Sequence, residues 1–145
     1  MFRTTIIATT VAAIVGFASL PAFAGNSVHI TQFGWGNGAG GVQTGVHNGI
    51  TVFQNGALNG ATANQTGFNN LSVIGQDGFH NTVATNQWGV NNEAGVAQFG
   101  ANNSASVGQV GSGNIAAGVQ VGNGCNATVH QAGSGNVSAF VQSCP

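Results

Sequence analysis

The chain has 145 residues, and only 2% of them are charged, against about a quarter in a typical soluble domain. Glycine supplies 25 residues, tyrosine is absent, and residues 25–145 contain no Lys or Arg, with Asp77 and Glu93 as their only acidic residues. A nucleic-acid partner is therefore excluded, because phosphate binding needs clustered basic side chains, and charge-driven docking on a membrane is disfavoured for the same reason.

Residues 1–24 have the features of a secretory signal peptide. Arg3 is the only basic residue of the chain, an apolar run extends over residues 5–20, and Pro21-Ala22-Phe23-Ala24 places small residues at the −3 and −1 positions. We expect cleavage after Ala24, which divides the chain into a signal peptide, 1–24, and a repeat domain, 25–145. A membrane anchor is the alternative, although the apolar run is short for a span of about 20 residues.

An 11-residue repeat fills residues 25–145, and its pattern is N-x-x-x-x-x-Q-x-G-x-x. The glutamines of the repeat are Gln32, Gln43, Gln54, Gln65, Gln76, Gln87, Gln98, Gln109, Gln120, Gln131 and Gln142. Six residues before them stand Asn26, Asn37, Asn48, Asn59, Asn70, Asn81, Asn92, Asn103, Asn114 and Asn136, with Cys125 as the exception. Two residues after them stand Gly34, Gly45, Gly56, Gly67, Gly78, Gly89, Gly100, Gly111, Gly122 and Gly133, with Cys144 as the exception.

This repeat predicts a strand followed by a turn in every unit. A helical supercoil with an 11-residue period is rejected, because a glycine in each unit costs a helix about 1 kcal/mol each time and no charges are present to set its register. We predict that the seven residues from Asn to Gln form the strand. The x-Gly-x-x segment that follows is the predicted turn, with Gly at positive φ.

The side chains alternate along each predicted strand. Positions two and four before Gln carry no charged residue, Asn, Gln or His, whereas the opposite parity holds Glu93, His29 and Asn86. The Gln-bearing face is therefore the predicted inner face. Two strands make a rung of about 22 residues, and rungs stack at about 4.8 Å. The expected fold is an all-β, two-sheet β-solenoid whose Asn and Gln amides form ladders along the axis.

Cys125 and Cys144 are the only cysteines, and both interrupt the repeat. Cys125 replaces the Asn of one unit and Cys144 replaces the Gly of a later one, so both fall in the same turn column on adjacent rungs. The stacked backbones should bring them within the roughly 4.4–6.8 Å between Cα atoms that a disulfide allows. We predict a Cys125–Cys144 bridge; two free thiols, or pairing between subunits, are the alternatives.

The repeat resembles that of the curlin family, whose pattern reads S-x5-Q-x-G-x-x-N-x-A-x3-Q. Residues 98–109 (QFGANNSASVGQ) and 109–120 (QVGSGNIAAGVQ) match the core of this pattern. The resemblance implies a secreted subunit that reaches the bacterial cell surface through the periplasm and an outer-membrane curli secretion pore. It further implies polymerisation with copies of itself on a nucleating minor curlin, giving amyloid fibres for biofilm matrix and adhesion.

No constellation of residues in the sequence indicates an enzyme, a cofactor, a metal site or a small-molecule substrate. His29, His47, His80 and His130 are spread along the chain, and the odd number of repeats between His47 and His80 places them on opposite edges of the predicted stack. Two alternatives to a major fibre subunit remain. One is a minor, nucleating curlin, and the other is a non-polymerising β-solenoid that binds a flat ligand.

Overall fold

The computed structural model describes residues 25–145, and the predicted signal peptide lies outside the described residues. The described chain is all-β. Its eleven strands are β1 (Ser27–Trp35), β2 (Gly38–Val46), β3 (Gly49–Ala57), β4 (Gly60–Phe68), β5 (Leu71–Phe79), β6 (Thr82–Val90), β7 (Glu93–Ala101), β8 (Ser104–Ser112), β9 (Ile115–Asn123), β10 (Asn126–Ser134) and β11 (Val137–Cys144). No helix long and apolar enough to cross a membrane occurs among these residues.

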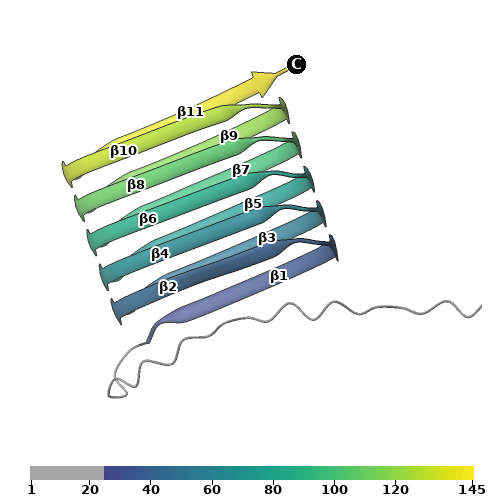
Figure 1. Ribbon diagram of the computed structural model, residues 1–145. Coiled ribbons are helices and arrows are strands. Elements are labelled where there is room, and N and C mark those ends of the chain that lie inside the picture. The colour runs from purple at the N-terminus through teal and green to yellow at the C-terminus, as the bar shows by residue number, and fades with distance from the viewer. Residues whose placement is uncertain (1–24) are drawn as a thin grey trace, which may run out of the picture.

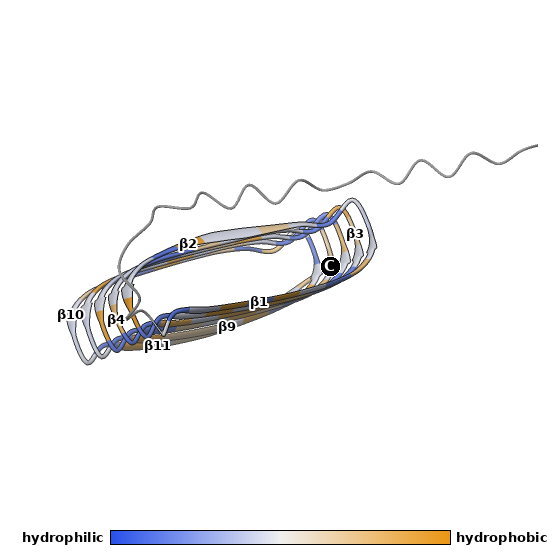
Figure 2. Ribbon diagram, turned by 90° about the horizontal axis from the view of Figure 1, so that it is seen from below, coloured by the Kyte–Doolittle hydropathy of each residue, from blue (hydrophilic) through white to orange (hydrophobic). Residues whose placement is uncertain are grey.

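The strands stack into two parallel sheets that face each other (Figure 1). Odd-numbered strands form a six-stranded sheet in the order β1-β3-β5-β7-β9-β11, and even-numbered strands form a five-stranded sheet in the order β10-β8-β6-β4-β2. Viewed along the stack, the chain traces a narrow closed loop, with one sheet on each long side and an arc at each end (Figure 2). The predicted two-sheet β-solenoid with 22 residues per rung is confirmed.

Every strand pairs with the strand 22 residues away, without a shift of register. Gln54 lies over Gln76 and Gly56 over Gly78 in the β3–β5 pair, and the other pairs repeat this match. A one-residue slip would turn every inner side chain outward, so the alternation of the sequence specifies this register. The repeat Gln and Gly residues therefore stack on their equivalents in the next rung, and Cys144 over Gly122 is the one exception among the described pairs.

The predicted boundaries between strand and turn were wrong. Each full strand has nine residues, starting one residue after the Asn and ending three residues after the Gln. The repeat glycine has φ between 103° and 127°, so its positive φ is as expected, but it lies within the strand. The chain turns the corner at the residue before the Asn, where φ is 54–73°. The corner lies next to the Asn because the Asn belongs to the arc and not to the strand, and its side chain points to the inside of the solenoid.

The repeat glycines are needed because the next rung lies directly over them. A Cβ added at Gly78 would collide with the carbonyl oxygen of Gly100, and the same collision is found at every other repeat glycine except Gly133, over which no described rung lies. At the corner the requirement is weaker. Asn69, Asn91 and Asn102 hold the left-handed conformation, which Asn tolerates, and Leu58 holds it as well.

The interior is thin and contains more buried amides than buried apolar side chains. Ile50, Val52 and Ile74 are buried against small residues of the facing sheet, such as Ala61 and Ala63. The central Gln and Asn side chains are buried just as completely, and most are 3% exposed or less. A row of buried amides is stable only when each polar atom is hydrogen-bonded, which makes the amide geometry decisive for the fold.

We predict that Gly78→Ala lowers the stability of the stack, whereas Gly75→Ala in the same strand does not. Gly78 has φ 127° and its Cβ would meet the Gly100 carbonyl, while a Cβ at Gly75 would meet nothing within 4 Å. The backbone conformation alone should cost about 1–3 kcal/mol. Guanidinium unfolding followed by circular dichroism measures both variants. Equal midpoints would contradict the account of the glycine column.

Candidate assembly site: amide columns and open ends

Glutamine side chains form two continuous hydrogen-bonded columns along the axis, one in each sheet. The Nε2 of each Gln donates to the Oε1 of the Gln 22 residues later, at 2.6–3.0 Å. Ten of the Gln side chains also donate from Nε2 to a backbone carbonyl 16 residues earlier, as Gln54 does to Gly38 at 3.1 Å, and for eight of them this is a second bond from the same nitrogen. This second bond crosses to the facing sheet, so each amide ties together two rungs and two sheets.

Asparagine side chains form two further columns, in the arcs, with the opposite polarity. The Oδ1 of each Asn accepts the backbone N–H of the Asn 22 residues later at 2.9–3.2 Å. The same Oδ1 accepts from the Nδ2 of that later residue. Each Nδ2 also donates to the carbonyl of the repeat Gly 19 residues later. One side chain thus satisfies several arc groups that no strand pairing reaches.

The requirement for amides follows from this geometry. Within its column, each amide donates to the neighbour on one side and accepts from the neighbour on the other, which only a group with both an N–H and a carbonyl oxygen can do. No buried side-chain nitrogen or oxygen lacks a partner among the described residues. The columns extend over all the Gln and Asn residues of the repeat, and the interruption at Cys125 falls in one arc column. The bonds from Asn to Gly were not predicted from the sequence, although the two residues of each pair are separated by 19 positions.

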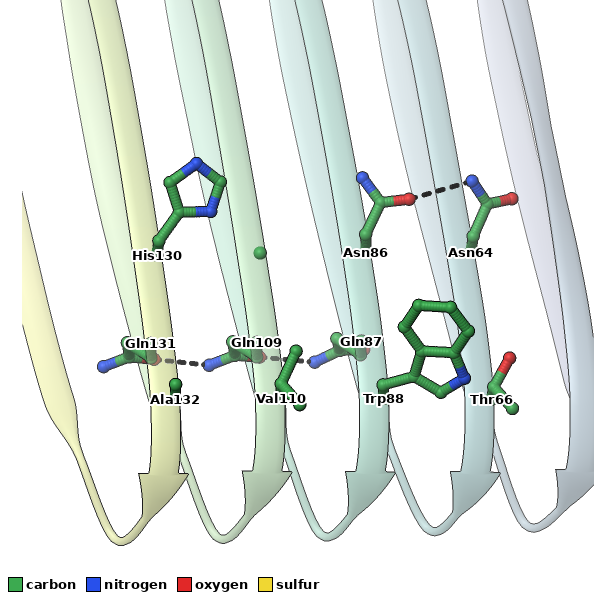
Figure 3. A pocket seen from close by; sticks show the side chains of 11 residues that line it. Asn64, Thr66, Asn86, Gln87, Trp88, Gln109, Val110, His130, Gln131 and Ala132 are labelled. Atoms are coloured by element: carbon green, nitrogen blue, oxygen red, sulfur yellow. Dashed lines mark hydrogen bonds between the residues drawn. The ribbon is translucent and has the colours of Figure 1, made fainter.

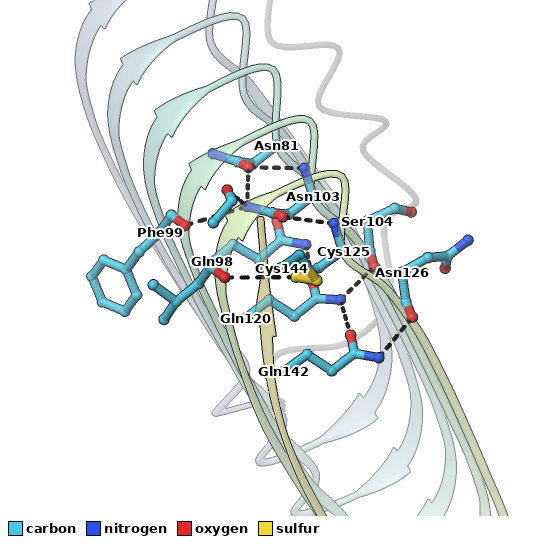
Figure 4. Close-up of a disulfide and its surroundings, with 12 residues drawn as sticks. Asn81, Gln98, Phe99, Asn103, Ser104, Gln120, Cys125, Asn126, Gln142 and Cys144 are labelled. Atoms are coloured by element: carbon cyan, nitrogen blue, oxygen red, sulfur yellow. Dashed lines mark hydrogen bonds between the residues drawn. A yellow bond between two sulfur atoms is a disulfide. The ribbon is translucent and has the colours of Figure 1, made fainter.

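The disulfide occupies the place of one of those arc bonds (Figure 4). Cys125 and Cys144 are bonded to each other across 19 residues, the separation at which every other unit has its bond from Asn Nδ2 to the Gly carbonyl. Their Cα atoms are 5.6 Å apart. The backbone N–H of Cys125 still donates to Asn103 Oδ1 at 2.9 Å. The covalent link therefore holds the end of β11 to the rung beneath in the same arc geometry.

The outer face of the solenoid is less regular than its interior. A groove of about 460 Å³ lies over Gly108 on the five-stranded sheet, between His130, Asn86 and Trp88 (Figure 3). Trp88 is largely exposed, and Asn64 donates to Asn86 at 3.0 Å beside it. The four histidines lie apart, and no group of three or more His, Cys, Asp or Glu suited to a metal occurs within residues 25–145. The outer residues vary from rung to rung, unlike the inner amides.

The two ends of the described stack are chemically complementary. At the β1/β2 end, the Oε1 atoms of Gln32 and Gln43 accept no bond from the described residues. At the β10/β11 end, Gln131 and Gln142 each use one Nε2 hydrogen on a backbone carbonyl and have the second unpaired within the same residues. In the Gln columns, one end of the described stack therefore offers acceptors and the other offers donors. Both ends also expose the unpaired backbone edges of parallel strands.

Fold and columns together define a class of protein: a repeat β-solenoid held by axial amide columns and open at both ends. Two stretches, residues 47–78 and 80–111, match the family model of the curlin associated repeat. The chain therefore carries curlin associated repeats over these residues, and the same 11-residue unit continues on both sides of them. A comparison with curated proteins gave no match.

We predict that Gln76→Glu weakens the stack at pH 7 and much less at pH 4. Gln76 accepts from Gln54 and donates to Gln98 and to the Gly60 carbonyl, so a carboxylate there would face two oxygens. Burial raises the pKa of the new carboxyl above its unfolded value of about 4.3. The penalty is therefore full above the raised pKa and disappears as pH falls below about 4.3. Unfolding midpoints at both pH values measure it.

Asn86→Asp is the matched control for this pH dependence. Asn86 lies on the exposed outer face, where its Oδ1 only accepts from Asn64. A solvated carboxylate keeps that bond, so we expect little change at either pH. A pH dependence of the same size in both variants would refute the assignment of the Gln column as the stabilising element.

We predict that Cys125→Ser/Cys144→Ser increases hydrogen exchange in β11 and leaves β5 unchanged. β11 has a neighbouring strand on one side only, and a loop of about 20 residues should contribute roughly 3 kcal/mol of stability on the chain-entropy model. Cys125→Asn/Cys144→Gly, which restores the repeat, should recover part of the protection through the Nδ2 bond. Unchanged exchange in the serine variant would show that the bridge holds nothing in place.

Proposed function

We propose that this chain is a curlin-family protein, a secreted structural subunit that polymerises with copies of itself into extracellular, curli-type amyloid fibres on the bacterial cell surface. The observation that carries the proposal is the complementarity of the two ends of the stack. Free Gln acceptors and strand edges lie at one end, and free Gln donors and strand edges lie at the other. A second copy that adds end to end continues columns that already exist.

Nothing on the described edges opposes such addition. Proteins that avoid edge pairing place Lys, Pro or bulges on edge strands. Residues 25–145 contain no Lys, their only proline is Pro145, and their only acidic residues, Asp77 and Glu93, lie in inner strands of the stack. Each added copy therefore gains strand pairing and amide bonds without charge repulsion.

The role in the fibre is structural rather than catalytic. We place the chain among the major subunits, with a nucleating minor curlin and an outer-membrane secretion pore as its partners, and with biofilm matrix and adhesion as the use of the fibre. The support is the match to the curlin associated repeat together with the uniform inner columns. The variable outer face, with exposed Trp88, Phe33 and Trp35, is the surface such a fibre would present to its surroundings.

The purified chain 25–145 should form thioflavin-positive fibres at micromolar concentration, with an axial reflection at about 4.7–4.8 Å. Gln131→Glu/Gln142→Glu is the matched variant. It keeps the bonds accepted from Gln109 and Gln120 but removes both Nε2 hydrogens of each side chain, the one bonded to a backbone carbonyl and the free one. Fibre elongation at that end should therefore slow at pH 7 and recover in part at pH 4, and an unfolding midpoint of the monomer at each pH separates lost elongation from lost stability.

A chain that stays monomeric both alone and after a different curlin is added would refute polymerisation. Fibres that appear only when a different curlin is added first would be consistent with the major-subunit role. Efficient seeding of another curlin by this chain, with no fibres of its own, would instead assign it as the nucleator.

A further inference from the structure

The described solenoid has an odd number of strands, and this constrains how a second copy fits. Six strands lie in one sheet and five in the other, so β11 has no counterpart above β10. The next position of the spiral is in the five-stranded sheet, over β10. A copy added by simple translation would place its β1 over β11 instead. It would leave a gap one strand wide between β10 and the β2 of the new copy.

We propose that successive subunits are related by a half turn about the stack axis, so that the β1 of the incoming copy pairs with β10 and its β2 pairs with β11. This inference rests on the proposed function and specifies its interface. The chain reverses direction at every arc, so the two sheets run in opposite directions (Figure 2). A half turn exchanges the sheets and reverses the strands together, which restores parallel pairing on both sides.

The Gln columns favour the half turn. In this arrangement Gln131 and Gln142 donate to Gln32 and Gln43 of the incoming copy, so both free donors meet both free acceptors. With translation alone, Gln142 meets the incoming Gln32, and Gln131 faces the gap. Two columns continue in the first case and one in the second.

The packing of the inner apolar residues favours the half turn independently of the Gln columns. Phe140 is the largest side chain of the inner face, and its ring lies over Gly118, where a Cβ would collide with it. The half turn places Gly41 of the incoming copy over Phe140, and its Ile30 over Val129. Gly41 and Gly118 are the only glycines at this inner position of the repeat, so the bulky ring lies between the two smallest residues available. Translation would instead stack the incoming Ile30 on Phe140.

One arc column is interrupted at this interface. The half turn brings the incoming Asn37 to Asn136, whose Oδ1 has no donor among the described residues, and brings the incoming Asn26 to Cys125, which has no side-chain oxygen. One amide link is therefore missing at each junction. A second strand pair and a second Gln link, which translation lacks, outweigh it. Each sheet of the fibre then alternates six and five strands, and the structural repeat is two subunits.

Cysteine pairs on the outer face distinguish the two arrangements. Val141, 81% exposed on β11, lies beside the incoming Val42 after a half turn and beside the incoming Thr31 after translation. Paired parallel strands lie about 4.8 Å apart, within the roughly 4.4–6.8 Å that a disulfide allows. Val42 and Thr31 both lie at the opposite end of the stack from Val141, so neither pair can form within one copy.

We expect Val42→Cys/Val141→Cys fibres to give a ladder of covalent oligomers on mild oxidation, seen in non-reducing gels and mapped by mass spectrometry. Thr31→Cys/Val141→Cys fibres should give at least tenfold less. Thr31→Cys/His130→Cys tests the other junction, because these residues lie side by side only after a half turn. Fibre formation by each variant is followed separately with thioflavin.

The outcomes separate this inference from the proposed function. Fibres that cross-link through Thr31→Cys/Val141→Cys, or through none of the pairs, overturn the half turn and leave polymerisation standing. An unmodified chain that forms no fibres overturns both. If one cysteine variant fails to assemble, the pair at the other junction gives the answer.

Discussion

The structure depends on one interaction, the hydrogen bond between identical amides one rung apart. It fills an interior too thin for an ordinary apolar core, and it does so without leaving a buried side-chain nitrogen or oxygen unpaired within residues 25–145. Because each Gln also bonds to the facing sheet, as Gln76 does to Gly60, the columns hold the two sheets together as well as the rungs. An unpaired buried amide would cost about 1–3 kcal/mol, so the columns stabilise the fold only when complete.

The backbone is arranged to keep those amides in line. The repeat glycines allow each rung to lie directly over the last, which keeps like residues in register. The Asn side chains occupy the arcs and bond the groups that the strands do not pair. Where Cys125 interrupts an arc column, a covalent bond to Cys144 spans the same 19 residues. The disulfide is thus a local replacement for the bond that the repeat uses elsewhere.

Interactions that continue from rung to rung do not saturate at the ends of the described stack. The Gln columns have a direction, so one end is left with acceptors and the other with donors. If copies add end to end as proposed, folding and assembly use the same bonds, and the odd number of strands in the described solenoid decides how neighbouring copies are oriented. A structural function would then rest on the interior of the protein.

The sequence by itself determined the repeat, the all-β class, the inner face and the 22-residue rung, because a strict 11-residue period with alternating side chains allows few other structures. The same period also predicted that each Gln and each Asn stacks on its equivalent 22 residues away. Tertiary structure decided what depends on contact between rungs: that the glycine bends within the strand, that the corner is at residues such as Leu58, and that the Asn amides bond to glycine carbonyls. It also decided the opposite polarities of the two kinds of column, since a direction of hydrogen bonding exists only once the rungs are stacked.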